Sequence, residues 1–173
     1  DMSLYANDYR AGERTFQLLT QAAGRAGRGK EKGEVVIQTY HPEHYSIVAA
    51  RAQDYKKFYQ EEIQYRELMG YPPAASLLAV LLTGEEEEHL QIAAGYLKEY
   101  ILRIDKRQEI DVIGPVAPYV GKVSDIYRKI LYLKCPEYGM LIKAKDRLEQ
   151  YIEINSGFRR LKIQFDFNPM NLF

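Results

Sequence analysis

"SLLAVLLTGEEEEHLQIAAGYLKEYILRI", residues 76–104, predicts a β-strand that is followed directly by an α-helix. The first nine residues are mostly apolar and end at a glycine, which is typical of a buried strand. From residue 85 onward, apolar residues recur at helical spacing and form one stripe: Leu90, Ala93, Ala94, Leu97, Ile101 and Ile104. Acidic residues complement the dipole at a helix start, so we interpret residues 85–88 as a helix start and not as a binding site.

The chain after residue 104 continues with alternating strands and helices. Strands are predicted over 110–114 and 127–136, a helix over 143–155 and a last strand over 161–167. Together with residues 76–104, these segments have the order β-α-β-β-α-β, which is that of the ferredoxin-like or split βαβ fold. We therefore expect one sheet with two helices on one of its faces.

The chain before residue 74 is richer in helix. Its pattern predicts a helix over 10–28, a strand over 34–40 ("EVVIQTY"), and two helices within 43–69 that meet near Gln53 and Asp54. "GYPP" at 70–73 ends the last of these helices, because proline cannot continue it. We place the main domain boundary there and expect an α/β chain whose C-terminal part is α+β.

The composition is that of an ordinary globular chain. It has 173 residues, of which 46% are hydrophobic, and 24 basic side chains balance 24 acidic ones, so a nucleic-acid partner must be argued from local clusters. The single cysteine excludes an intramolecular disulfide and a cysteine-based metal site. Since no apolar run reaches the roughly 20 residues of a membrane helix, we expect a soluble, cytoplasmic protein without a membrane partner. Because the patterned sequence begins at once and without an initiator Met, we treat the chain as a piece of a longer polypeptide.

"QAAGRAGRGK", residues 21–30, places two glycines and two arginines where the pattern is otherwise helical. On a helical wheel, Gln21, Arg25 and Arg28 share one face, opposite the apolar stripe, and Gly24 lies beside them. Between residues 10 and 32 there are six basic side chains and two acidic ones, so a polyanion is the natural partner. The alternative is a solvated helical face whose glycines only help to end the helix.

The stretch "QLLTQAAGRAGRG" (17–29) resembles the motif Q-x-x-G-R-x-G-R of superfamily-two helicases, which faces an ATP cleft between two RecA-like lobes. The resemblance implies that Arg28 is an arginine finger and that Arg25 has a second phosphate-binding or coupling role. It implies that Gln21 lies near the γ-phosphate or the attacking water, beside Gly24. A planar guanidinium suits this role, because it can bind the equatorial phosphate oxygens in a bidentate way that lysine cannot.

Three longer stretches are similar to the PriA family of replication-restart helicases: 9–29, "FYQEEIQYRELMGYPPAASLLAV" (58–80) and "VIGPVAPYVGKVSDIYRKILYLKCP" (112–136). The resemblance implies that residues 1–40 end the second RecA-like helicase lobe, 41–73 form a helical connector, and 74–173 form the ferredoxin-like C-terminal domain. It implies an ATP-dependent 3′-to-5′ DNA helicase that remodels stalled forks during primosome assembly and is associated with the nucleoid. The implied partners are branched or single-stranded DNA, the single-strand-binding protein and other primosome proteins.

Several family features have no counterpart in this sequence. The loop that holds ATP phosphates, the acidic motif for Mg²⁺ and the cysteine-rich zinc insertion lie upstream in the family. We therefore expect this piece alone not to hydrolyse ATP. Asn7 and Asn168 stand where the family usually has proline and aspartate, and the loop before Arg128 is less basic than usual.

Residues 119–134 are the candidate nucleic-acid surface of the C-terminal part. The predicted binding residues are Lys122, Tyr127, Arg128, Lys129 and Lys134, because basic groups follow phosphates and tyrosines stack on bases. Strand alternation places Tyr127 and Lys129 on one face and Arg128 and Lys134 on the other, so some of them must be core or edge residues. The alternatives for this surface are that it binds a partner protein or that it is only solvated. The alternative function for the whole piece is that of a non-catalytic DNA- or protein-binding module. An unrelated RNA helicase of superfamily two fits less well, because the proline-marked stretches argue against it.

The remaining chemically notable residues have structural interpretations. His41 and His44 have a metal-like spacing but lack a third ligand. Cys135 is expected to pack at a strand end. The glutamates near residues 61–67 are interpreted as helix surface charges paired with Lys57 or Arg66, and the basic residues near 159–162 as a charged turn.

Overall fold

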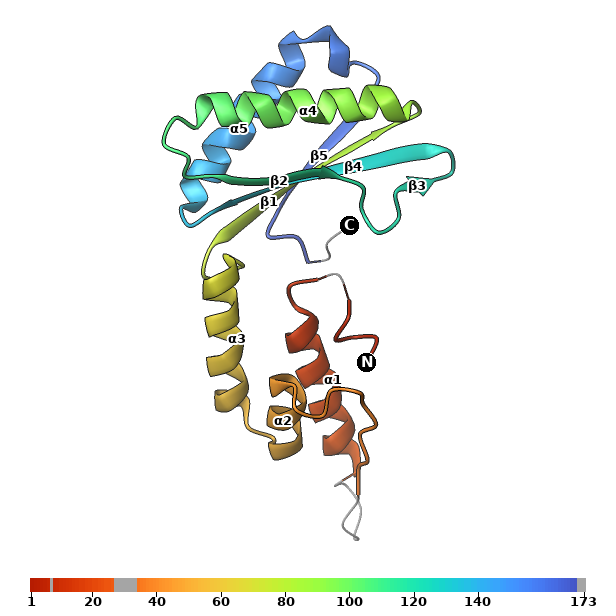
Figure 1. Cartoon of the computed structure of the whole chain (residues 1–173), viewed down its shortest axis with the longest axis vertical. Helices are drawn as coiled ribbons and strands as arrows, with labels where there is room; N and C mark the ends of the chain where they lie inside the picture. The colour runs from red at the N-terminus through yellow and green to blue at the C-terminus, as the bar shows by residue number, and fades with distance from the viewer. Residues whose placement is uncertain (7, 27–33, 171–173) are drawn as a thin grey trace. The chain divides into compact units, whose positions relative to one another are not determined.

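The computed structural model describes residues 1–6, 8–26 and 34–170. The chain divides into two compact units, Asp1–Met69 and Gly70–Phe173. Each unit has its own cluster of buried apolar side chains, and no residue belongs to both clusters. Figure 1 shows that the first unit is helical and that the sheet belongs to the second.

The described part of the first unit contains three helices: α1 (Ala11–Ala26), α2 (Tyr45–Ala52) and α3 (Tyr55–Met69). The predicted junction between α2 and α3 is confirmed. Gln53 ends α2 with a left-handed φ of 51°, and the Asp54 carboxylate accepts a 3.0 Å hydrogen bond from the backbone N–H of Lys57 in the first turn of α3. Phe16 of α1 stacks on Phe58 of α3 with ring centroids 4.3 Å apart, which fixes the apolar side of α1.

The strand predicted over 34–40 is wrong for the described structure. Residues 34–39 have no regular secondary structure, and the strands of the described residues all lie within 76–167. A β-branched run forms a strand only where a neighbouring strand completes its hydrogen-bond ladder. Here the segment is held instead by Asp1, whose carboxylate accepts hydrogen bonds from the Thr39 hydroxyl at 2.6 Å and the Tyr40 backbone N–H at 2.9 Å.

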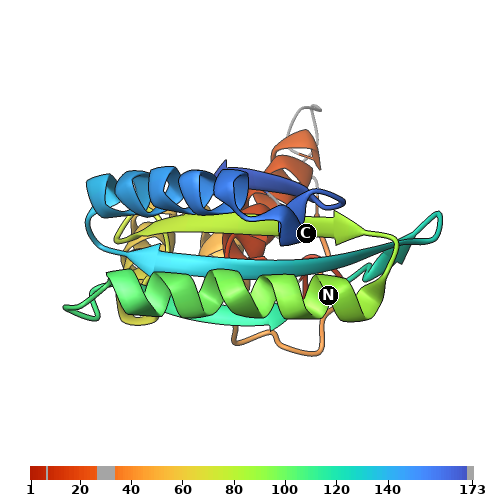
Figure 2. The same cartoon turned by 90° about the horizontal axis from the view of Figure 1, so that it is seen from above.

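The second unit has the predicted order β-α-β-β-α-β with one added short strand. Its elements are β1 (Ser76–Gly84), α4 (Glu87–Ile104), β2 (Asp111–Val116), β3 (Lys122–Val123), β4 (Ile126–Cys135), α5 (Tyr138–Ile154), a 3₁₀ turn (Ser156–Phe158) and β5 (Lys162–Phe167). The sheet order is β2-β4-β1-β5 with every pair antiparallel, and β3 pairs with β4. Helices α4 and α5 lie on the same face of the sheet (Figures 1 and 2).

The main core lies between the sheet and these two helices. Alternate residues of β1 point into it, while the residues between them lie on the other face, where Ala79 and Leu81 form a small buried cluster with Ile130. The predicted α4 stripe is confirmed, because five of its members are buried and Ile104 packs against the core. The larger core side chains are Leu78, Val80, Leu82, Leu90, Leu97, Ile101, Leu131, Leu133, Leu141 and Leu148.

Helix α5 begins at Tyr138, five residues before the predicted start at residue 143. The added turn buries Leu141, which lies three residues before Ala144 and continues its stripe toward the N-terminus. Pro136 follows the last residue of β4, so only two residues separate the strand from the helix. The early start matters below, because it brings Met140 beside the loop that follows α4.

Candidate functional site

Helix α1 presents the described part of the predicted phosphate-binding motif on its exposed side. Gln21, Gly24 and Arg25 are exposed, while Phe16 on the opposite side is buried in the core of the first unit. Arg28 lies outside the described residues. Apart from the neighbouring residues of its own helix, a Cβ added at Gly24 would meet no described atom within 4 Å, so packing among the described residues does not explain this glycine. The arrangement leaves room for a ligand or another backbone to approach the helix here.

An ion network around the buried residues Arg66 and Glu62 holds the first half of α1 against the other two helices. Arg66 of α3 lies 2.7 Å from the carboxylates of both Glu13 in α1 and Glu62 one turn earlier in α3. The Tyr45 hydroxyl of α2 donates a 2.7 Å hydrogen bond to the other oxygen of Glu62. The three helices are therefore joined by charge-assisted hydrogen bonds, which fix the direction in which α1 carries its exposed polar residues.

The electrostatics of this network agree with its geometry. Burial disfavours the charge of Arg66, but the hydrogen bonds that its guanidinium donates to Glu13 and Glu62 outweigh this effect, so the pKa of Arg66 lies above its ordinary value. Burial, reinforced by the hydrogen bond to Glu62, also raises the pKa of Tyr45. The pairing of Glu62 with Arg66 was predicted, but the interpretation of Glu62 as a surface charge is wrong, because only 5% of the residue is exposed.

The hairpin of β3 and β4 brings three of the predicted nucleic-acid-binding residues together at one end of the sheet (Figure 1). Its turn residues Ser124 and Asp125 have φ of 48° and 62°, as a tight two-residue hairpin turn requires. The Lys122 ammonium lies 4.6 Å from the centre of the Tyr127 ring and 2.9 Å from the Asp125 carboxylate. The Arg128 guanidinium donates a 3.2 Å hydrogen bond to the Val120 carbonyl.

The hairpin lysine keeps its charge. A hydrogen bond with Asp125 raises the pKa of Lys122 above its ordinary value. The Tyr127 ring lies against Lys122 and packs on the main core, while strand alternation places Arg128 on the opposite face of β4. Lys122 and Arg128 are therefore two cations of the hairpin that can bind phosphate, but the Tyr127 ring is already in contact with the protein.

The two remaining predicted binding residues lie elsewhere. The Lys129 side chain is 15% exposed on the helix-covered face of the sheet, and its ammonium lies 3.4 Å from the carboxylate of Glu87 in α4. Lys134 is near the other end of β4, about 24 Å from Tyr127 at about 3.4 Å per residue. Its ammonium lies 3.9 Å from the centre of the Tyr71 ring, and burial lowers its pKa. The predicted surface is therefore not one continuous patch.

His44 and Cys135 have structural surroundings. The Nδ1 atom of His44 accepts a 3.2 Å hydrogen bond from the Ser46 backbone N–H and caps α2. Cys135 is buried at the end of β4, and burial raises the pKa of its thiol. Over residues 1–6, 8–26 and 34–170, no cluster of three or more His, Cys, Asp or Glu side chains has a metal-binding arrangement. None of the described helices combines the length and apolar character that crossing a membrane requires.

A pocket that the sequence patterns do not predict opens between the end of α4, the loop that follows it and α5. It depends on the early start of α5 and on the approach of two segments that are about 35 positions apart in the chain. The only local signal is the spacing of Lys143 and Arg147, which are four residues apart and therefore share a helix face.

Comparison with known proteins gives consistent matches. The family model described as primosomal protein N C-terminal domain matches residues 67–170. The chain is 33% identical over 169 residues to the replication restart protein PriA of Bacillus subtilis, covering 98% of this chain and 21% of that protein. The PriA proteins of Synechocystis and Thermotoga maritima are 35% and 36% identical and cover 87% and 92% of this chain, and 18% and 21% of those proteins. The chain thus spans about a fifth of the length of these curated relatives.

Proposed function

The chain belongs to the family of the primosomal protein N C-terminal domain, and from this premise we propose that it is part of an ATP-dependent 3′-to-5′ DNA helicase that restarts stalled replication forks. The carrying observation is the exposed group of Gln21, Gly24 and Arg25 on α1, in a chain that is similar over almost its whole length to proteins named replication restart protein PriA. In this proposal, residues 1–40 belong to the second RecA-like lobe and α1 lines its nucleotide-facing side.

The residues of α1 fit a nucleotide phosphate. They are polar, exposed and grouped around a glycine with open space, and the ion pair of Glu13 with the buried Arg66 holds the helix in position. We propose that Gln21 and Arg25 contact the terminal phosphates, and that Arg28, outside the described residues, is the arginine finger. In this proposal, ATP and Mg²⁺ would be held mainly by other parts of the parent protein, and the terminal phosphoryl group of ATP would be the one transferred to water. We also propose that the parent protein binds zinc, at a site outside the residues of this chain.

The proposed partners follow from the same premise. They are branched or single-stranded DNA, the single-strand-binding protein and other primosome proteins, and the proposed location is the cytoplasm, at the nucleoid. The hairpin cations Lys122 and Arg128 support a DNA contact of the second unit.

Arginine substitutions in a protein that contains the remaining helicase parts test this proposal. We expect Arg28→Ala to lower DNA-stimulated ATP hydrolysis by about 10³-fold or more, because a finger arginine stabilises the charge of the transition state, and Arg25→Ala to lower it less. DNA binding should stay within about twofold of the unaltered protein. Arg51→Ala, an exposed arginine in the last turn of α2, is the matched control. Normal turnover in Arg28→Ala would reject the assignment.

A second candidate function, a DNA-binding module that works without ATP, is favoured by the hairpin. Titration of this chain with forked and single-stranded DNA at several salt concentrations measures its affinity for DNA and the salt dependence of that affinity. Lys122→Glu combined with Arg128→Glu should weaken binding about tenfold at low salt and reduce the slope of log affinity against log salt by about 2. Lys56→Glu with Lys57→Glu, on exposed positions of α3, makes the same change in net charge. Equal losses in both double variants, or no binding at low salt, would reject a specific role of the hairpin.

A further inference from the structure

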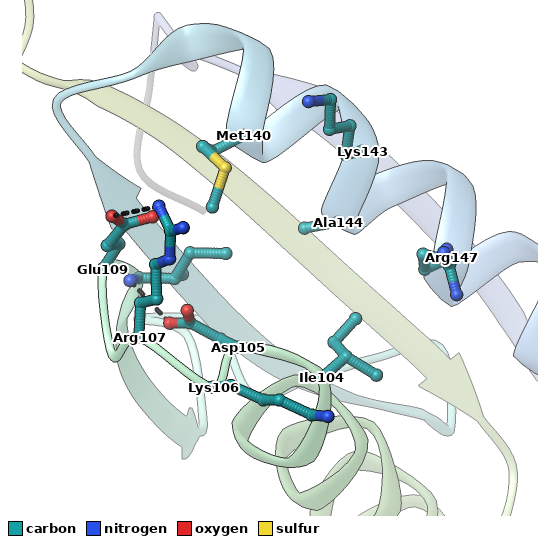
Figure 3. Close-up of a pocket in the computed structure, with 10 residues that line it drawn as sticks. Ile104, Asp105, Lys106, Arg107, Glu109, Met140, Lys143, Ala144 and Arg147 are labelled. Carbon is teal, nitrogen blue, oxygen red and sulfur yellow. Dashed lines mark hydrogen bonds and ion pairs between the residues drawn. The ribbon is translucent and has the colours of Figure 1, made fainter.

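A second pocket lies between the same two helices, at the opposite end from the pocket in Figure 3. Figure 3 shows the end of α4 at Ile104 and the first half of α5, with Met140 and Arg147. The second pocket lies between the first half of α4 and the end of α5, and the two pockets share no lining residue. Its lining includes no residue of the α1 motif or of the β3–β4 hairpin, so it belongs to neither candidate site above.

The size and lining of this second pocket suit one small planar group. Its volume is about 280 Å³, just below the roughly 300–1,000 Å³ of pockets for drug-sized ligands. Three of the residues that line it are aromatic (Tyr96, Tyr151 and Phe158), and none is acidic. An aromatic, uncharged lining favours a flat ligand that can stack.

Tyr96 is the ring that is available to such a ligand. Tyr151 is stacked on Tyr100 with ring centroids 4.2 Å apart and meets the edge of Phe158 at 5.8 Å, so these rings are already fixed by the protein. Tyr96 is 59% exposed, and among the described residues no other aromatic ring contacts it. Ile92, one turn earlier on α4, is also exposed and lines the pocket. A flat group can therefore lie against Tyr96 and Ile92.

Two polar side chains of the lining offer hydrogen-bond acceptors. The Nε2 atom of His89 lies 2.7 Å from the Gly157 carbonyl oxygen. Because a carbonyl only accepts, Nε2 carries the proton, and the Nδ1 atom of the neutral ring is an acceptor. The Asn155 amide nitrogen donates a 2.6 Å hydrogen bond to the Tyr151 carbonyl, and among the described residues the Asn155 amide oxygen has no partner. Every unpaired nucleobase has an N–H donor on its Watson–Crick edge, so these acceptors suit a base.

The chain that follows the pocket lining is basic. Arg159 and Arg160 come directly after Phe158 and are exposed, and within residues 1–6, 8–26 and 34–170 neither forms an ion pair. Apart from the neighbouring residues of its own segment, a Cβ added at Gly157 would meet no described atom within 4 Å, which leaves room for a ligand. The acidic residues 85–88 at the start of α4 repel phosphate, so a nucleic-acid backbone is directed toward the two arginines.

We propose that this pocket takes up one unpaired base of single-stranded DNA. The base stacks on Tyr96, its edge donates a hydrogen bond to His89 or Asn155, and the neighbouring phosphates pair with Arg159 and Arg160. A base inside a duplex would first have to leave its stack and its partner, so the site selects single strands. The choice of DNA over RNA rests on the proposed function, whereas the base pocket itself rests on the residues that line it.

A fluorescent side chain at the stacking position tests the proposal. The sequence has no tryptophan, so Tyr96→Trp gives this chain a single indole in the pocket. We expect decathymidylate to quench the emission of this indole, because a stacked base quenches it. A decamer of abasic deoxyribose phosphates, which has the same phosphates but no bases, should leave the emission nearly unchanged. Tyr40→Trp, at an exposed tyrosine of the first unit, is the matched control and should respond to neither probe.

Fluorescence anisotropy with dye-labelled decathymidylate measures what the ring contributes to affinity. Tyr96→Ala should weaken binding about fivefold or more, because it removes the stacking of one base. Tyr96→Phe keeps the ring and should bind within about twofold of the unaltered chain. Ile154→Ala is the control, because Ile154 is exposed near the end of α5 but does not line the pocket.

Charge reversal tests the phosphate contacts. Arg159→Glu with Arg160→Glu should weaken binding about tenfold at low salt, since two attractive contacts become repulsive. Lys106→Glu with Arg107→Glu, exposed in the loop at the other end of α4, makes the same change in net charge and should alter affinity less than about twofold. If circular dichroism shows that the first variant is unfolded, the neutral pair Arg159→Gln and Arg160→Gln replaces it.

Several results would overturn the proposal. These are the absence of quenching by decathymidylate, equal affinity for decathymidylate and the abasic decamer, a loss in Tyr96→Ala no larger than in Ile154→Ala, and equal losses in the two charge-reversed variants. Reversal of the quenching by millimolar N-acetylphenylalaninamide would also overturn it, because the pocket would then hold a peptide side chain. Normal ATP hydrolysis in Arg28→Ala would reject the helicase assignment but would not change the quenching, so the two failures are distinguishable.

Discussion

Asn168 follows the last strand and satisfies both backbone groups of one residue in β1. Its backbone N–H donates to the Leu77 carbonyl at 2.7 Å, and its side-chain oxygen accepts from the Leu77 N–H at 2.8 Å. Its φ is 48°, in the left-handed region that asparagine tolerates better than most residues. The departure from the aspartate usual in similar sequences therefore keeps the acceptor and suits the backbone.

Substitutions of Asn168 should show how much its side-chain hydrogen bond to Leu77 and its tolerance of a positive φ contribute to stability. We expect Asn168→Asp to lower the free energy of unfolding of the second unit by less than about 1 kcal/mol, because a carboxylate can still accept from Leu77. Asn168→Ala should lower it by roughly 2–4 kcal/mol, because the Leu77 N–H loses its partner and alanine disfavours a positive φ. Urea denaturation of both variants measures the difference. Similar values for the two would show that the side-chain bond contributes little.

We expect the stability of the first unit to depend on pH through His44. Burial lowers its pKa, against an opposing effect of Glu62. The folded state therefore binds this proton less readily than the unfolded chain does. The neutral imidazole therefore contributes its full stabilisation above pH 6.5, the ordinary pKa of histidine. As the pH falls from 6.5 toward the lower pKa of the folded state, the unfolded chain is protonated first and this stabilisation is lost. Protonation also removes the Nδ1 acceptor and puts a positive charge at the N-terminus of α2.

We expect the melting temperature of the first unit to fall by a few degrees at most between pH 7.5 and pH 5.5 because of this group. His44→Asn keeps a good N-cap without a titrating ring, so its melting temperature should fall less over the same interval. Thermal melts followed by circular dichroism at both pH values give the comparison. The same pH dependence in both proteins would show that another group is responsible.

At the scale of elements, the second unit was largely predictable. The limits of β1, the buried stripe of α4 and the β-α-β-β-α-β order follow from apolar periodicity, because each element buries one face against the same core. Helix α5 starts five residues before the predicted position, since Leu141 continues the stripe without a local start signal. The sequence pattern does not predict β3, because its two residues form a strand only by pairing with β4.

The candidate sites were predictable to different degrees. The exposed side of α1 follows from the wheel, which separates Gln21 and Arg25 from Phe16, and the structure has the same separation. In the 119–134 stretch, strand alternation predicts that the side chains divide between two faces, but not which face the helices cover. That face contains Lys129, which accordingly pairs with Glu87 from a distant part of the chain.

At the scale of the whole molecule, the two separate cores predict two unfolding transitions. The described cluster of the first unit has four buried residues around Phe16 and Phe58, and that of the second unit has sixteen. Because stability rises with the apolar area that is buried, the first unit should melt at the lower temperature.

Matched core truncations test this independence. Phe58→Ala should destabilise the first unit by roughly 3–5 kcal/mol and shift only the lower transition, whereas Leu97→Ala should destabilise the second by roughly 2–5 kcal/mol and shift only the upper one. Differential scanning calorimetry resolves the two. A single transition that moves in both variants would show that the chain unfolds as one unit.

The sequence by itself determined the β-α-β-β-α-β order of the second unit apart from the short strand β3, the stripe that α4 buries, the boundary of α2 and α3, and the exposed side of α1. These features can be predicted because they depend on the spacing of apolar residues within one element or on residues next to each other in the chain. Only the tertiary structure decided that residues 34–39 lack a strand, that Glu62 is buried in an ion network with Arg66 and Glu13, and that Met140 meets the loop after α4. Each of these depends on a partner distant in the chain, and burial and hydrogen-bond partners are properties of the packed molecule, not of the local sequence.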